Sequence, residues 1–134
     1  LSRDQLVFAI FDGQRSLADN LLRTGIDDGL LPIQFIRQLQ FHIERLLSVR
    51  TTVEQGRSIE QALGQLHPPV FFKFRKNFHQ QIKLWPTALL RKCFRALVNL
   101  EIECKSTGTP NVALCQRMSL SISGLAHKLT QQNQ

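Results

Sequence analysis

Seven basic side chains are concentrated in one stretch of the chain, where they could bind an anionic partner. Residues 61–100 contain no acidic residue, and basic and acidic residues balance elsewhere, so the formal net charge of +7 arises in this block. The seven residues are Lys73, Arg75, Lys76, Lys83, Arg91, Lys92 and Arg95. A concentrated positive potential attracts nucleic acid, anionic lipid or an acidic protein surface. A solvated basic face on an ordinary domain is the alternative, and both interpretations stay open.

Phenylalanines are interleaved with the first of these basic residues. The run Phe71-Phe72-Lys73-Phe74-Arg75-Lys76 has the mixture of aromatic and basic side chains with which proteins stack single-stranded nucleic acid. A stripe of apolar residues three or four apart also runs through this stretch, at Phe71, Phe74, Phe78, Ile82 and Trp85. This spacing favours core packing for Phe71 and Phe74 and leaves only Phe72 over for stacking.

Metal and catalytic chemistry lack a recognisable residue pattern. The H-x-E triplet at residues 42–44 matches half of the zinc deaminase signature, but the required P-C-x-x-C is missing. Cys93, Cys104 and Cys115 stand alone rather than two to four residues apart, as in structural zinc sites. No glycine-rich phosphate loop is present. We therefore predict no metal, no cofactor and no catalytic site, and an enzyme is the least favoured class.

The three cysteines also indicate the redox environment. An odd number cannot pair completely, and on one helix Cys93 and Cys104 would be about 16 Å apart, too far for a disulfide. We expect all three to be small buried hydrophobes in a reduced, cytoplasmic protein.

Apolar residues recur at helical spacing through almost the whole chain, and strand-like alternation is nearly absent. The pattern predicts an all-α fold, a compact bundle of about six to seven helices. With 134 residues, 43% of them hydrophobic and 20% charged, the chain is long enough for one domain with a single core. Its longest apolar run, Leu6 to Phe11, is far shorter than the roughly 20 residues of a membrane-spanning helix, so we expect no membrane segment.

Glycine, proline and capping residues mark the predicted ends of the helices. We expect helices over residues 2–12, 16–24, 32–55, 59–67, 71–85, 87–106 and 110–130. Gly13, Gly25 and Gly56 are the expected stops of the first three, because glycine commonly follows a helix end. Ser58 and Gln61 form a capping box that opens the fourth.

The helix predicted after Pro86 is apolar on more than one side. Its main stripe consists of Leu90, Cys93, Leu97, Leu100 and Cys104. Val98 and Ile102 lie roughly on the other side. A helix of this kind is either central or has a second partner, so Val98 and Ile102 are the candidate apolar residues of a subunit interface.

Several runs of residues, taken in their order and spacing, resemble a known family. They are Leu30 to His42, Glu44 to Leu47, Pro68 to Lys73 followed by Trp85, Glu103 to Gly108, and Ala113 to Arg117. Together they are similar to the C-terminal domain of the bacterial DNA polymerase III delta subunit, in the form seen in alphaproteobacteria. The resemblance extends from about Val7 to Ser123.

This resemblance implies a role in assembly rather than catalysis. The delta subunit belongs to the clamp loader, which places the sliding clamp on primed DNA, and its C-terminal domain is a helical bundle. Such domains from delta, delta prime and the tau or gamma subunits pack into a collar that holds the pentamer together. ATP binding lies in tau or gamma, and the sliding clamp is contacted by the N-terminal domain of delta. The parent holoenzyme is a DNA-directed DNA polymerase, a transferase.

We accordingly interpret residues 1–134 as a single collar domain for oligomerisation. Because the chain begins with Leu1 rather than Met, we expect a trimmed fragment whose N-terminal domains are absent. The alternative is a freestanding basic helical domain that binds DNA or RNA through residues 61–100. The sequence does not decide which helix faces contact which neighbours, or whether the basic block contacts DNA.

Overall fold

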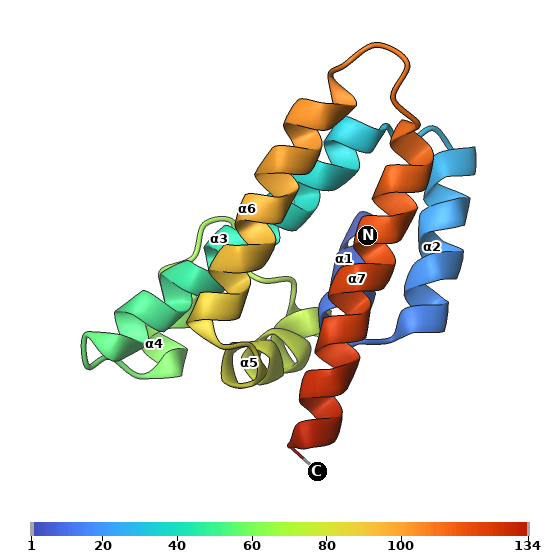
Figure 1. The fold of residues 1–134 in the computed structure, drawn as a ribbon. Coiled ribbons are helices and arrows are strands. Elements are labelled where there is room, and N and C mark those ends of the chain that lie inside the picture. The colour runs from blue at the N-terminus through green and yellow to red at the C-terminus, as the bar shows by residue number, and fades with distance from the viewer. Residues whose placement is uncertain (1, 134) are drawn as a thin grey trace.

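Helices make up nearly all of the fold. The structure, a computed structural model, describes residues 2–133, and within them seven α-helices, one 3₁₀ turn and no strand are found (Figure 1). The elements are α1 (Ser2–Asp12), α2 (Arg15–Asp27), α3 (Pro32–Glu54), α4 (Ile59–Gly64), η1 (Phe72–Phe74), α5 (Arg75–Leu84), α6 (Thr87–Cys104) and α7 (Asn111–Gln132). The predicted all-α bundle of six to seven helices is confirmed.

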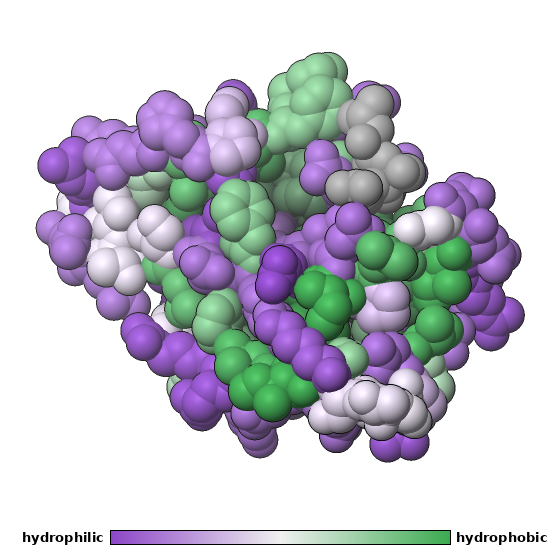
Figure 2. Space-filling view, turned by 90° about the horizontal axis from the view of Figure 1, so that it is seen from above, coloured by the Kyte–Doolittle hydropathy of each residue, from purple (hydrophilic) through white to green (hydrophobic). Residues whose placement is uncertain are grey.

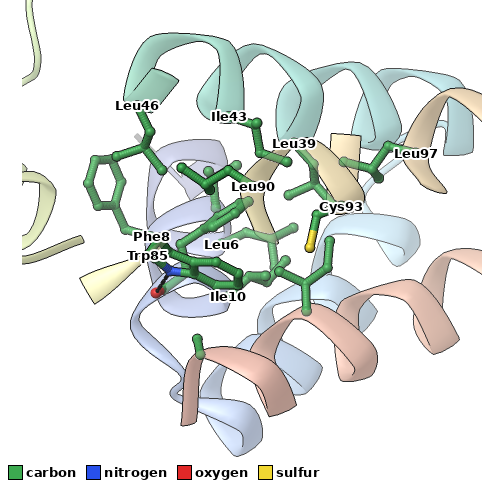
Figure 3. Close-up of a cluster of buried hydrophobic side chains, with 14 of the residues drawn as sticks. Leu6, Phe8, Ile10, Leu39, Ile43, Leu46, Trp85, Leu90, Cys93 and Leu97 are labelled. Atoms are coloured by element: carbon green, nitrogen blue, oxygen red, sulfur yellow. Dashed lines mark hydrogen bonds between the residues drawn. The ribbon is translucent and has the colours of Figure 1, made fainter. Parts of the chain in front are cut away.

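Helix α1 lies in the centre because its apolar run leaves it no polar face. Every residue from Leu6 to Phe11 is at most 8% exposed. A helix that is apolar on all sides must be covered on all sides. Helices α2, α3, α5 and α7 all contact α1, and α6 lies beside α3 (Figure 1). Figure 3 shows Leu6, Phe8 and Ile10 of α1 facing Leu39 and Ile43 of α3 and Leu90 and Cys93 of α6.

The first helix ends at the predicted glycine, against the backbone of α7. The amide of Gln14 donates to the carbonyl of Ala9 (3.0 Å), and Gly13 has a φ of 79°. This is the left-handed helix end that favours glycine. A Cβ atom at Gly13 would lie 2.6 Å from the backbone nitrogen of His127 in α7. Gly13 therefore allows α1 and α7 to approach closely as well as ending the helix.

A buried polar network joins α1, α3 and α5. Asp12 accepts two hydrogen bonds, from Asn77 Nδ2 at Oδ2 (2.7 Å) and from Gln81 Nε2 at Oδ1 (2.7 Å). Since the amide nitrogen of Gln81 donates to Asp12, its Oε1 accepts from His42 Nε2 (2.7 Å), which assigns the proton to that ring nitrogen. Burial lowers the pKa of His42 to about 4 and raises the pKa of Asp12. His42 is therefore neutral in the folded protein near pH 7.

Arg50 of α3 fixes the corner between α5 and α6. Its guanidinium donates to the carbonyls of Ile82 and Trp85, the latter at 2.9 Å, and to Thr87 Oγ1 at 2.8 Å. The indole of Trp85 donates in turn to the carbonyl of Phe11 at the end of α1 (3.0 Å). These bonds satisfy carbonyls at helix ends, which have no partner within their own helix. They also set the direction in which α6 leaves the corner.

Four predicted boundaries are wrong. Helix α4 ends at Gly64 rather than near residue 67, because the amides of Gln65 and Leu66 close the helix end in a tighter turn on the carbonyls of Ala62 and Leu63. Helix α2 continues through Gly25 to Asp27, because the residue with positive φ is Gly29 (φ 99°), where the amide of Leu30 closes the helix end on the carbonyl of Gly25. The aromatic stripe is not one helix over residues 71–85, because a 3₁₀ turn precedes α5 and leaves Phe71 before the helix. Helix α6 ends at Cys104 rather than near residue 106.

Replacing Gly13 with alanine is expected to destabilise the protein by about 2–4 kcal/mol, since a Cβ there combines left-handed backbone strain with a clash against α7. Gly56→Ala is the matched control, because Gly56 also has a positive φ (99°) but a Cβ added to it would meet no atom within 4 Å. It should cost only about 1 kcal/mol. Urea unfolding of both variants measures the difference, and equal losses would contradict the close approach of α1 to α7.

The free energy of unfolding should fall as the pH decreases from 7 to 5, by about 2 kcal/mol from His42 alone. Its folded pKa of about 4 lies below the usual value of 6.5, so the unfolded chain takes up the proton first. The stabilisation is complete above pH 6.5 and is lost between 6.5 and 4. The raised pKa of Asp12 increases the free energy of unfolding as the pH falls, so the contribution of His42 must be isolated by comparison with a variant.

His42→Leu supplies this comparison, because Asp12 is present in both proteins. The variant is expected to lose less stability than the wild type between pH 7 and pH 5. Chemical unfolding at each pH gives the two slopes. Parallel slopes would show that His42 is not held neutral in the folded state.

Candidate partner-binding surface

The seven basic residues are exposed and divided between two helices. Lys73, Arg75, Lys76 and Lys83 belong to η1 and α5, and Arg91, Lys92 and Arg95 belong to the first half of α6. No ion pair involves any of them among the side chains that the structure describes. Because α6 leaves the end of α5 in a different direction (Figure 1), the block is not one continuous stripe along a single helix. The structure therefore places all seven in solvent and separates them into two groups.

The outer face of α6 brings basic and apolar candidates together. Arg91, Arg95, Val98 and Ile102 are spaced four, three and four residues apart, which keeps them within an arc of about 60°. We call these four residues the α6 outer stripe. Val98 is 38% exposed and Ile102 is 64% exposed. The helix buries its opposite side, so the outer stripe faces solvent. Its role as an interface stays a prediction.

Glu101 holds α6 in this orientation. Its carboxylate accepts from Gln40 Nε2 of α3 (3.1 Å) and pairs with Arg37 of α3 (3.3 Å) and Lys105 (3.3 Å). The hydrogen bonds from Gln40 and Lys105, with the nearby Arg37, lower the pKa of Glu101. The acid next to the outer stripe is thus already occupied by partners of its own, and it is not available to neutralise Arg91 or Arg95.

A groove lies between α6 and α7. It is open to solvent and has a volume of about 410 Å³. Its lining residues are Ala96, Asn99, Leu100, Glu103, Leu114, Arg117, Met118 and Ser121. The two helices are tied at one end, where Asn111 Nδ2 donates to the carbonyl of Cys104 (2.9 Å). Figure 2, which looks down on the end that holds this connection, shows apolar residues in separate green patches between polar ones.

A second hollow, of about 390 Å³, is lined largely by aromatic and proline side chains from α1, α3, α5 and residues 68–71. Arg45 closes one side by donating to the carbonyl of Pro68 (2.6 Å), and its guanidinium lies 5.3 Å from the ring centre of Phe41. Phe41 is 49% exposed and Phe72 is 71% exposed. Phe72 is thus exposed, as the helical spacing predicted. The sequence did not predict the hollow, because the residues that line it are far apart in the chain.

The described part of the chain contains neither a candidate metal site nor a candidate membrane-spanning helix. Within residues 2–133, no cluster of three or more His, Cys, Asp or Glu side chains could hold a metal ion. In the same part of the chain, no helix combines the length and hydropathy needed to cross a bilayer. Cys93, Cys104 and Cys115 are all free and buried, and burial raises the pKa of each thiol. Their chemistry is that of small apolar side chains.

Comparison with known proteins gives one informative result. No protein-family model matches the chain, and no curated protein matches it. Among solved structures, the chain is similar to the Bacillus subtilis DNA clamp loader delta protein YqeN, with a TM-score of 0.74 and 18% identity. The similarity covers 92% of this chain and 36% of that one, so the chain spans about a third of the solved protein's length. At this identity the likeness shows the fold: the chain has the helical fold of part of a clamp-loader delta protein.

Proposed function

We propose that the chain is the collar domain of a clamp-loader delta subunit and acts by association with other subunits. The observation that carries this proposal is the similarity of 92% of the chain to part of a clamp loader delta protein. A collar domain must offer apolar surface beyond its own core. Val98 and Ile102, exposed on α6, supply such surface in the described part of the chain.

The partners in this proposal are the tau or gamma subunits and delta prime. Contact with the sliding clamp, ATP hydrolysis and polymerisation belong to other domains and subunits of the DNA polymerase III holoenzyme. The assembly would act in the cytoplasm during DNA replication. The solved neighbour comes from Bacillus subtilis, so the finer resemblance to the alphaproteobacterial form rests on the sequence runs alone.

Direct binding of nucleic acid is the less favoured function. Its basis is the exposed basic block, whose two groups lie on helices that run in different directions (Figure 1). Arg91 and Arg95 share their face of α6 with Val98 and Ile102, whose apolar side chains offer nothing to a phosphate backbone. Weak contact with DNA within the assembled loader is compatible with the collar proposal.

The proposal predicts that the chain co-elutes with tau or gamma and delta prime from the same organism. Size-exclusion chromatography of the mixture, after nuclease treatment, should show the chain shifted into the complex. Failure to co-elute with any of these subunits would contradict the proposal. The alternative, direct binding of nucleic acid, is tested with a 20-base-pair DNA duplex. It requires that the chain bind the duplex with an affinity that falls steeply as the salt concentration increases.

A further inference from the structure

We propose that the α6 outer stripe is the seat of a partner helix that presents acidic residues to Arg91 and Arg95 and apolar residues to Val98 and Ile102. This inference rests on the proposed function, since it assigns the surface through which the domain joins a neighbouring clamp-loader subunit. The spacing of four, three and four residues is that of a coiled-coil seam. A second helix can follow such a seam over three turns.

Burial supports a protein partner at the apolar end of the stripe. Ile102 leaves 64% of its surface in solvent, and Val98, one turn earlier, leaves 38%. DNA would gain nothing from burying these residues.

Charge determines the chemistry of that partner at the other end. Arg91 and Arg95 are one turn apart, and like charges at this spacing repel. Neither forms an ion pair with the side chains of residues 4–133. The residue between them in sequence that also carries charge, Lys92, is basic too, and Glu101 on the same helix is engaged by Arg37 and Lys105. Acidic side chains on the partner would relieve this repulsion.

The type of basic residue points in the same direction. Arginine is enriched in protein interfaces and lysine is depleted, because the planar guanidinium binds carboxylates with two hydrogen bonds. The outer stripe carries two arginines, whereas three of the four basic residues of η1 and α5 are lysines. The two groups of the basic block therefore differ in chemistry as well as in position.

Charge reversal separates the two groups. The 134-residue chain carrying Arg91→Glu with Arg95→Glu is expected to bind reconstituted tau or gamma with delta prime at least about 10-fold more weakly than the wild type. The control, Lys73→Glu with Lys76→Glu, changes the net charge equally but lies off α6, and should stay within about 2-fold. Ile102→Asp should weaken binding similarly, whereas Leu120→Asp, at a residue 51% exposed on α7, should not.

All of these positions are exposed, and circular dichroism checks that each variant stays folded. If the glutamate pair unfolds, Arg91→Gln with Arg95→Gln removes the charges more gently and should still weaken binding several-fold. If the α6 variants bind the subunits as tightly as the wild type does, the inference is overturned and the proposed function stays intact. A wild type that binds no subunit would overturn both. Loss of duplex DNA binding with unchanged subunit binding would assign the stripe to DNA and also overturn the inference.

Discussion

The burial of six consecutive apolar residues, Leu6 to Phe11, is the constraint on which the rest of the fold depends. A helix without a polar face needs neighbours around its whole circumference, and α2, α3, α5 and α7 supply them. Gly13 then lets the end of α1 approach α7, and the indole of Trp85 satisfies the carbonyl of Phe11. Once α1 is enclosed, α6 packs on α3 and remains an outer helix with one free face (Figure 1).

Side chains of α3 also position the candidate surface on α6. Arg50 fixes the corner from which α6 starts, and Glu101 fixes its rotation against α3. Both contacts are made by side chains of α3, the helix that also carries His42 into the buried network. The outer stripe is thus presented by a helix whose position and rotation are set before any partner arrives. A preorganised surface loses less conformational entropy on binding than a flexible one.

Helical phase was predictable from the sequence because it is local. The spacing within residues 87–104 predicts which side of α6 is buried, and Val98 and Ile102 are exposed accordingly. Helix ends were less predictable, because Gly25 and Gly29 are equally good stops by residue type and only Gly29 adopts the positive φ. The contacts of Arg50 with Trp85, and of Asp12 with Gln81, join residues 35 and 69 positions apart, and no local pattern signals them. The hollow beside Phe41 was missed for the same reason.

The central claim is that the chain joins its neighbours through the outer face of α6. Site-specific photocrosslinking tests it most directly, with benzoylphenylalanine placed at Ile102 and, as the control, at Leu120 on α7. In a mixture with tau or gamma and delta prime, the account predicts a crosslink to one of these subunits from position 102 and little from position 120. Crosslinks from position 120 alone, in a mixture that assembles, would contradict it.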